Sequence, residues 1–467
     1  MNATRSSRYE HAGSFRSAHT EALSAEARHV SDPILGLVAL GLLFIVIFIG
    51  FPIAFTLAAV ALGTGYIALG PRIFDLAVLQ TFSVMRDTVL ASVPFFLLMG
   101  FLLEQSGLVE RLFRGIQQLL AGMRGSLYLA TLITATIFAA ATGIVGSAVT
   151  LLGVLAGPSM IKSGYDTKMS AGAIAAGGTL GILIPPSVML IVMGPVVGIP
   201  ATDLFAAAVL PGLMLAGLFT VWCLVRCWIN PALGPVLPMS ERAPSLGPVI
   251  KDLLLGVAPV IVVIMSTLGV ILAGIATPTD AGAVGCFATF LLTFGSGRMS
   301  WAKLKRAALQ TLEVSSMILM LVVASNLFGS VFSRLGSAEF LANMLTSLSL
   351  PPTLMLIVIL ALIFLLGWPL EWVPIVLIIL PIVLPIVQAA GIDLIWFCTL
   401  VAVTLQTAWL SPPVALSAYF LKGVVPQWEL KQIYAGMVQF MFLQVVGVGI
   451  LIAFPQLATW LPKVMAN

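Results

Sequence analysis

Two proline pairs interrupt apolar stretches of the chain, and the residues around them repeat at a constant spacing. Pro185-Pro186 interrupts GGTLGILIPPSVMLIV, and Pro412-Pro413 interrupts LQTAWLSPPVALSAYF 227 residues later. The same spacing relates three further pairs of residues: Pro158 and Pro385, Gly164 and Gly391, and Asp166 and Asp393. Proline disrupts a helix, and such a break is tolerated in lipid only where it lines a protein cavity. The duplication therefore predicts one central binding site built from both breaks.

The two ends of each break carry opposite partial charges. Carbonyls freed near Gly181–Ile184 and Thr407–Leu410 lie at the negative end of one half-helix, and the N–H groups from Ser187 and Val414 onward lie at the positive end of the next. A sodium ion suits the carbonyl end and an anionic substrate suits the N–H end, so neither requires a formal charge within the membrane. A single proline pair would be explained more simply as a kink that serves only helix packing. Because the pair is duplicated, and because each copy follows a predicted helical hairpin, a binding site is favoured.

Composition indicates a membrane protein. Of the 467 residues, 60% are hydrophobic and 9% are charged, and runs such as Leu253–Ala273 and Val438–Phe454 are long enough to cross a hydrocarbon core of about 30 Å. We therefore expect an all-α polytopic membrane protein. The net charge of +4 is spread over loops, which argues against nucleic-acid binding. The sequence contains no Walker-type motif, metal-ligand cluster or nucleophile–base pair, so we expect neither an ATPase nor another enzyme.

The predicted elements fall into two parallel halves. Residues 1–33 are polar and are expected to form a disordered extension, and residues 230–251 form a proline-rich connector. We expect a first membrane repeat over 34–229 and a second over 252–467. If both repeats face one site at the middle of the membrane, they must be inverted relative to each other.

Each repeat is expected to place a helical hairpin before its broken helix. The hairpins cover about 127–161 and 353–387, and the broken helices cover 168–198 and 393–422. The segments that join the hairpin helices, TGIVGS and GWPLEW, are short, which suits a re-entrant hairpin that ends inside the membrane. Two ordinary spanning helices joined by a tight turn are the alternative.

The two hairpin tips differ in chemistry. The first carries Gly143, Gly146 and Ser147, which offer a flexible backbone and a hydroxyl oxygen. The second carries Glu371, a carboxylate that either faces the binding site or lies at a wet turn near the membrane surface. The first tip is therefore small and hydroxyl-bearing, whereas the second is bulky and acidic.

Other charged residues in apolar regions have structural explanations. Glu104, Glu313 and Arg334 lie near the ends of apolar runs, where long side chains are expected to reach the polar interface. Asp166 and Asp393 follow Gly-x in short loops and are expected to cap the helices after them.

Several segments resemble the large membrane subunit (DctM-type) of TRAP transporters, the tripartite ATP-independent periplasmic carriers: GYDTKMSAGAIAAGGTLGILIPPSVMLIVMG, SVPFFLLMGFLLEQSG, TPTDAGAV and LSPPVALSAYFLKGV. The resemblance runs from about Leu35 to the C-terminus. It implies a sodium-coupled importer of small organic anions that works by an elevator-like movement, with no cofactor beyond Na⁺ and no transition metal. It also implies a small four-helix membrane subunit, expected here as a separate chain, a periplasmic substrate-binding protein, and a multi-pass location in the bacterial inner membrane.

The resemblance implies two sodium and substrate sites by position. The first comprises the first hairpin tip and break: Gly143, Gly146, Ser147, Gly178, Thr179, Gly181, Pro185, Pro186 and Ser187. The second comprises the corresponding residues of the second half: Gly367, Trp368, Glu371, Trp372, Thr407, Ser411, Pro412 and Pro413. The chain departs from the family pattern after Glu371, where tryptophan and valine replace proline and threonine. Trp368 and Trp372 are instead expected to reshape the substrate cavity.

Two other functions compete with this reading. A stand-alone divalent-anion symporter of similar paired-hairpin architecture would use the same breaks without a binding protein. A membrane-embedded enzyme or assembly scaffold is disfavoured because the sequence has no catalytic constellation.

Overall fold

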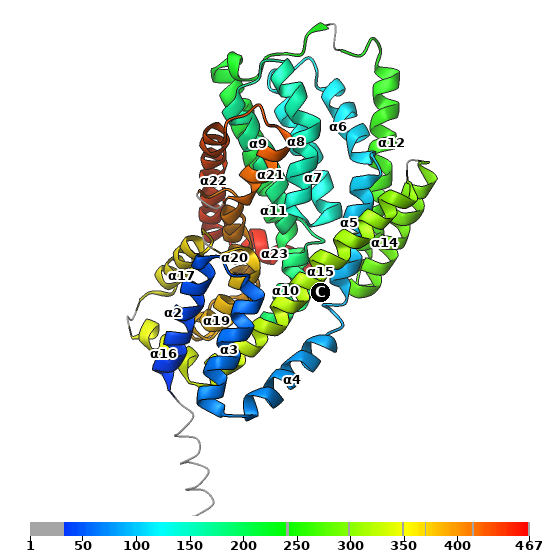
Figure 1. Cartoon of the computed structure of the whole chain (residues 1–467). Helices are drawn as coiled ribbons and strands as arrows, with labels where there is room; N and C mark the ends of the chain where they lie inside the picture. The colour runs from blue at the N-terminus through cyan, green and yellow to red at the C-terminus, as the bar shows by residue number, and fades with distance from the viewer. Residues whose placement is uncertain are drawn as a thin grey trace, which may run out of the picture. The chain divides into compact units, whose positions relative to one another are not determined.

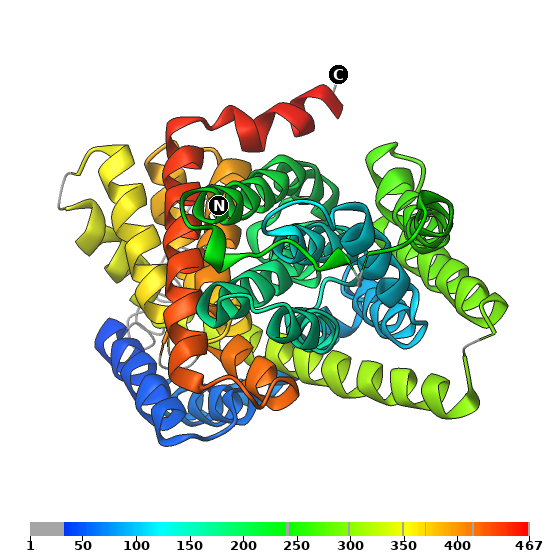
Figure 2. The same ribbon diagram turned by 90° about the horizontal axis from the view of Figure 1, so that it is seen from above.

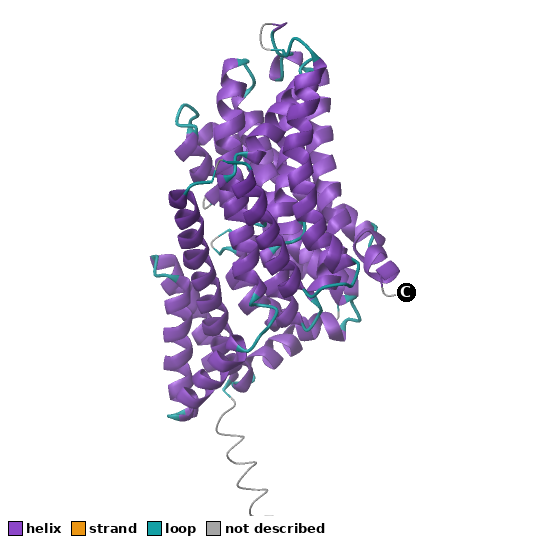
Figure 3. Ribbon diagram, turned by 90° about the vertical axis from the view of Figure 1, so that its right-hand side faces the viewer, coloured by secondary structure: helices purple, strands orange, loops and turns teal. Residues whose placement is uncertain are grey.

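The structure is a computed structural model that describes residues 32–239, 242–297, 299–347, 350–368, 370–412 and 415–465. These residues form helices and loops, with no strand among them (Figure 3). Six of their helices are long and apolar enough to cross a membrane, and up to eight if each of two bent helix pairs is one span. The predicted N-terminal extension over 1–33 lies almost entirely outside the described residues, as does Pro413.

The described chain divides into two compact units. The first contains residues 32–85 and 320–347, with α2 (Pro33–Ile49), α3 (Ile53–Leu69), α4 (Arg72–Met85), the end of α15 (Trp301–Arg334) and α16 (Ser337–Thr346). Asp32 caps α2, because its carboxylate accepts hydrogen bonds from the N–H groups of Ile34 and Leu35. The Ser337 hydroxyl donates to the Pro33 carbonyl at 3.0 Å and joins α16 to α2.

The second unit contains residues 86–319 and 350–465 and holds both predicted hairpins and both proline breaks. Its earlier helices are α5 (Ser92–Gln105), α6 (Leu108–Leu119), α7 (Ser126–Thr142), α8 (Val145–Lys162), α9 (Thr167–Leu183), α10 (Val188–Val197), α11 (Ala201–Ile229), α12 (Leu246–Ile264), α13 (Val270–Leu272) and α14 (Pro278–Gly295). Its later helices are α17 (Pro352–Leu366), α18 (Trp372–Pro374), α19 (Leu380–Ala389), α20 (Leu394–Gln406), α21 (Leu416–Val424), α22 (Leu430–Ala453) and α23 (Gln456–Met465). Each unit therefore draws on both predicted halves, and α12 begins inside the segment predicted as the connector.

Helix α9 lies at the centre of the second unit. Every residue from Met169 to Leu183 is buried, as expected for a helix that is apolar all round. It packs against α7, α8 and α22 (Figure 1). Figure 2 shows the later helices α20–α22, in orange to red, beside the teal to green helices of residues 126–229, and contacts between α22 and α9 and between α21 and α8 join the two groups. The two stretches of chain that repeat in the sequence therefore share one core.

Both broken helices begin at the predicted aspartate caps. The carboxylate of Asp166 accepts a hydrogen bond from the N–H of Met169 at 2.8 Å, and that of Asp393 accepts one from Trp396 at 2.8 Å. The first helical residues, Thr167 and Leu394, are 227 positions apart (394 − 167). The sequence spacing thus coincides with equivalent helix starts.

The first hairpin turns more sharply than its sequence indicates. Only Gly143 and Ile144 separate α7 from α8, so Gly146 and Ser147 lie in the first turn of α8 rather than in the joining loop. Gly143 has φ +63°, a left-handed conformation that glycine adopts without a Cβ penalty and that ends α7 at once. The 18 residues of α8 extend about 27 Å, so length alone permits either a re-entrant or a spanning hairpin.

The second hairpin is less regular. After α17 the chain turns at Gly367 and Trp368, and a helical run follows from Trp372 to Ala389. This run contains a π-helical turn, η4 (Ile375–Ile379), between α18 and α19. A π-helical turn inserts an extra residue into the helix, and the sequence pattern did not predict it.

Candidate functional site

The first hairpin tip packs directly onto the first proline break. A Cβ atom on Gly143 would lie 2.9 Å from the carbonyl oxygen of Pro186, and one on Gly181 would lie 3.5 Å from the nitrogen of Ile144. One turn earlier, a Cβ on Gly178 would lie 3.1 Å from the nitrogen of Val149. Glycine at these positions therefore lets the tip backbone contact the backbone of the broken helix, as the small residues in the sequence predict.

The first break separates α9 from α10, whose axes differ in direction by 41°. Ile184 and Ser187 have extended backbone conformations between the two helices. The Ser187 hydroxyl donates a hydrogen bond to the carbonyl oxygen of Ile182, one of the groups next to the break. Ser187 therefore stabilises the break locally, and its N-cap position directs the first N–H groups of α10 out of the helix end.

The second break combines a tight helical turn with two hydroxyl groups. Helix α20 ends at Gln406 and continues as the 3₁₀ turn η5 (Thr407–Trp409) before α21 begins. The Thr407 hydroxyl donates to the Thr404 carbonyl at 2.5 Å, and the Ser411 hydroxyl donates to the Thr407 carbonyl at 2.6 Å. Both hydroxyl oxygens keep lone pairs that can bind a cation.

The second hairpin tip also packs onto its break. A Cβ atom on Gly367 would lie 3.2 Å from the Cβ atom of Ala408 in η5. Trp368 is 38% exposed and packs edge-to-face on Phe364, with 5.9 Å between ring centroids. Pro412 is partly buried beside Ser411.

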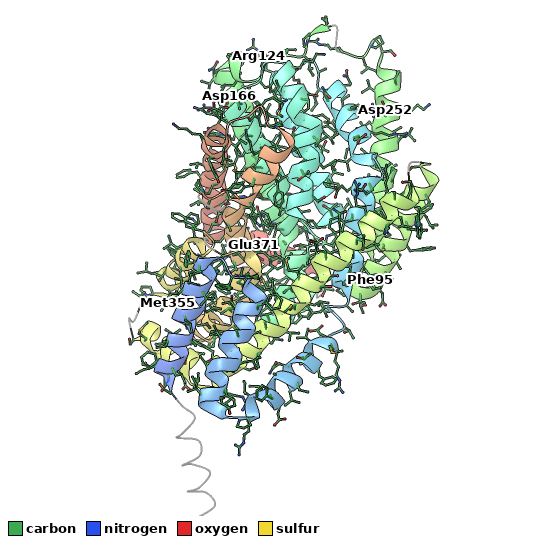
Figure 4. The ribbon with its side chains drawn as sticks, in the orientation of Figure 1. Phe95, Arg124, Asp166, Asp252, Met355 and Glu371 are labelled. Carbon is green, nitrogen blue, oxygen red and sulfur yellow. The ribbon has the colours of Figure 1, made fainter. Side chains whose placement is uncertain are left out.

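Both tips and both breaks contribute to one cavity of about 120 Å³. It is lined by Leu97, Gly143, Ile144, Val145, Gly146, Ile182, Val188, Met189, Val314, Met317, Ile318, Glu371, Trp372, Val373 and Trp409. Figure 4 shows Glu371 away from Arg124 and Asp166, which lie at one end of the α7–α9 bundle. Four predicted site residues, Gly143, Gly146, Glu371 and Trp372, thus line a common space.

The other predicted site residues take different places. The predicted residues of the tips and breaks that do not line the cavity are Ser147, Gly178, Thr179, Gly181, Pro185, Pro186, Ser187, Gly367, Thr407, Ser411 and Pro412. Of the two tryptophans expected to reshape the cavity, only Trp372 lines it. Trp409, which the sequence argument did not select, supplies a second indole wall, and its ring stacks on Phe420 with 6.5 Å between centroids.

Glu104 contacts the first hairpin tip. Its carboxylate accepts a hydrogen bond from the Ser147 hydroxyl. The reason is tertiary packing: a Cβ on Gly100 would lie 3.0 Å from the Thr142 carbonyl oxygen, so α5 passes close to the tip. Glu104 is therefore a candidate site residue that the sequence argument missed.

A buried amide links the two broken helices. The Gln444 side chain of α22 donates from Nε2 to the Thr179 hydroxyl oxygen at 3.1 Å and to Gln406 Oε1 at 3.3 Å. Neither glutamine was selected from the sequence. Gln406 could have been found, because it lies 227 positions after Thr179 (406 − 179), but nothing in the pattern singles out Gln444.

Within the described part of the chain, no three His, Cys, Asp or Glu residues are grouped as metal ligands. The polar groups at the site are instead backbone carbonyls, hydroxyls, amides and two carboxylates. Oxygen ligands of this kind suit a hard cation such as Na⁺ better than a transition metal.

Comparisons with known proteins show the family to which the chain belongs. Residues 40–457 match the family described as "Tripartite ATP-independent periplasmic transporter, DctM component". The chain is 29% identical over 405 residues to the C4-dicarboxylate TRAP transporter large permease protein DctM of Rhodobacter capsulatus, covering 83% of this chain and 90% of that protein. It is 28% identical to the isethionate TRAP transporter permease protein DctMQ of Oleidesulfovibrio alaskensis, covering 84% of this chain and 61% of that protein.

Among solved structures, the Alcanivorax borkumensis YdaH transporter shares the fold, with a TM-score of 0.59 and 16% identity. The similarity covers 85% of this chain and 89% of that one. The predicted family resemblance and all-helical membrane fold are thereby confirmed. The chain belongs to the DctM family of large permease subunits of TRAP transporters, and it is an integral, multi-pass membrane protein and not an enzyme.

Proposed function

We propose that this permease couples the inward movement of sodium to the import of a small organic anion. The observation that carries the proposal is the cavity in which Gly143, Glu371 and Trp409, from two hairpins and a break, meet. In secondary transporters, half-helix ends within the membrane hold coupling ions at their carbonyl ends and anions at their N–H ends. The same two ends are present here at the first break, in α9 and α10.

One sodium site is proposed at the first tip and break. The Ser147 hydroxyl and the Glu104 carboxylate lie together at the first tip, whose residues Ile144 and Val149 pack against Gly181 and Gly178 of α9. A carboxylate balances the cation charge in a region of low dielectric constant, where an unpaired charge is costly. Glu104 thus supplies the proposed site with a negative charge.

A second sodium site is proposed at the second tip and break. Glu371 supplies a carboxylate, and Thr407 and Ser411 supply hydroxyl oxygens next to the freed carbonyls. The threonine that the family pattern has after its acidic residue is replaced here, so the hydroxyls of the break provide the side-chain oxygens.

The anionic substrate is proposed to bind at the N-terminal end of α10. Val188 and Met189, the first two residues of α10, line the cavity, so the positive end of that helix is directed at it. Trp372, Trp409 and aliphatic side chains form the remaining walls and favour a compact apolar body. The two relatives compared above are named for C4-dicarboxylates and isethionate, which are small anions.

The proposal extends to the architecture and the partners. The 227-residue repeat supports two inverted halves, and the presence of both hairpins and both breaks in one compact unit supports an elevator-like mechanism. We propose a bacterial inner-membrane location, a periplasmic substrate-binding protein and a small four-helix membrane subunit. A separate small subunit stays a prediction, since the DctMQ relative joins both membrane components in one chain.

Uptake is expected to require an inward sodium gradient. The chain, reconstituted into vesicles with the small subunit and the substrate-loaded binding protein, should accumulate radiolabelled substrate with sodium outside and little when potassium replaces it. Uptake that continues unchanged in potassium-only buffer would exclude sodium coupling. Equal uptake without the binding protein would instead support the stand-alone symporter, which family membership disfavours.

Removing the hydroxyls at the two sites is expected to weaken sodium dependence. Ser147→Ala and Thr407→Ala each delete one oxygen, and we expect the sodium concentration for half-maximal uptake to rise about 5- to 10-fold, as for the loss of a hydrogen bond or ligand worth about 1 kcal/mol or more. Folded yield in detergent should change less. Thr459→Ala on α23, whose hydroxyl bonds only to the Pro455 carbonyl of its own chain segment, is the matched control. Unaltered sodium affinity in both site variants would remove these hydroxyls from the sites.

A further inference from the structure

Gln444 joins the two broken helices through a single buried amide. Its Nε2 atom donates to Thr179 on α9 at 3.1 Å and to Gln406 on α20 at 3.3 Å. All three side chains are fully buried. They lie in the second unit, where glycines allow α22 to pack closely against α9: a Cβ on Gly172 would lie 2.6 Å from the carbonyl oxygen of Gly436.

The two acceptors of this amide occupy equivalent positions in the sequence repeat. Thr179 and Gln406 are 227 residues apart, and each lies six residues before the first proline of its pair (185 − 179 and 412 − 406). The position equivalent to Gln444 in the first half is Gly217 (444 − 227), which has no side chain to offer. The Gln444 side chain therefore contacts both copies of the duplicated broken helix. The equivalent position of the first half holds no second glutamine.

The hydrogen bonds of the two glutamines are incomplete in this arrangement. Gln406 Nε2 and Gln444 Oε1 are buried and have no hydrogen-bond partner among the described residues. A buried donor and a buried acceptor left unpaired are unfavourable, and a native protein rarely keeps them without a reason. A small change in the relative position of α9 and α20 would alter which of these bonds form, so the network is sensitive to the geometry of both breaks.

We infer that Gln444 is a positioning residue that couples the two helix breaks, so that binding at one break changes the sodium affinity at the other. The inference rests on the proposed sodium sites, one at each break. Thr179 lies in the turn of α9 that carries the first site, and Gln406 is followed directly by Thr407 of the second. Coupling between sites requires a physical element with which both interact, and the Gln444 amide is such an element.

The test measures the cooperativity of sodium activation. Wild-type transporter, reconstituted with its small subunit and binding protein, should show a Hill coefficient approaching about 2 for two coupled sites. Gln444→Met keeps the length of the side chain but removes both hydrogen bonds, and the Hill coefficient should fall to about 1 with maximal uptake largely retained. Gln439→Met on the same helix is the control, because Gln439 donates to the Ala435 carbonyl of its own helix and should leave cooperativity unchanged.

Gln406→Met and Thr179→Val provide a second measurement if Gln444→Met lowers the folded yield. Each should reduce the Hill coefficient, and combining either with Gln444→Met should cause no further loss, because all three act through one network. Cooperativity that persists in Gln444→Met and Gln406→Met overturns the inference. A wild-type curve that is sodium-dependent but hyperbolic also overturns it while sodium coupling stands, and a wild type without sodium dependence overturns both.

Discussion

Gly143→Ala is expected to reduce sodium-driven uptake at least about tenfold while the protein still inserts and folds. The residue has φ +63°, which costs a non-glycine residue about 1–2 kcal/mol. The added methyl group would also lie 2.9 Å from the Pro186 carbonyl oxygen, closer than a carbon atom normally approaches an oxygen. The first hairpin tip must then move away from the first break, and about 1.4 kcal/mol of lost binding is enough for a tenfold effect.

Gly198→Ala is the control that separates the effect of the Gly143–Pro186 contact from the effect of backbone strain. Gly198 ends α10 with φ +71°, yet nothing lies within 4 Å of the position its Cβ would take. It therefore carries the same conformational cost without a collision, and we expect its uptake to stay within about twofold of wild type once corrected for yield. Similar losses in Gly143→Ala and Gly198→Ala would show that strain alone matters and that the tip contact does not.

The contact between tip and break occurs in both halves, and this bears on mechanism. Gly143 lies against Pro186 in the first half, and Gly367 lies against Ala408 in the second. If each hairpin tip stays in contact with its broken helix, then the site cannot open by a movement of the tip alone. The broken helix must move with it. This favours a transport step in which the hairpins and broken helices move together, in keeping with the proposed elevator-like movement.

Features that depend on local sequence were predictable. Helix caps at Asp166 and Asp393 follow from the ability of a short carboxylate to accept from a backbone N–H three residues later. The breaks follow from proline chemistry, and the glycines before Pro185 indicate close backbone contacts from the sequence alone. In each case the responsible atoms lie within a few residues of one another in the chain.

Features that depend on tertiary packing were not predictable. Glu104 lies at the end of an apolar run, and only the approach of α5 to the first hairpin brings its carboxylate to Ser147. Trp409 faces the cavity because a 3₁₀ turn rotates the chain after Gln406. Gln444 looks like one polar residue in a long apolar helix until α22 is packed between the two breaks. Single-sequence periodicity contains no information on such distant neighbours.

Glu371→Gln is expected to raise the sodium concentration for half-maximal uptake at least about tenfold. Glu371 is the one carboxylate among the residues that line the cavity, and no lysine or arginine is among them. A full charge within about 4–6 Å of a bound cation contributes about 3–4 kcal/mol at an effective dielectric constant near 20. The amide keeps the shape of the side chain and removes a partly buried charge, so the folded yield should not fall.

Two further variants test whether the effect depends on the negative charge at position 371. Glu371→Asp keeps the carboxylate on a shorter side chain and should recover part of the sodium affinity, which a purely structural role of the side chain does not predict. Glu313→Gln removes a carboxylate from α15 at an exposed position that does not line the cavity, and it should leave the sodium curve unchanged. If Glu371→Gln transports with wild-type sodium affinity, then the second site is built from Thr407, Ser411 and the carbonyls of the break alone. The carboxylate of the second tip would then have no part in sodium binding, because the variant that removes its negative charge keeps the wild-type sodium affinity.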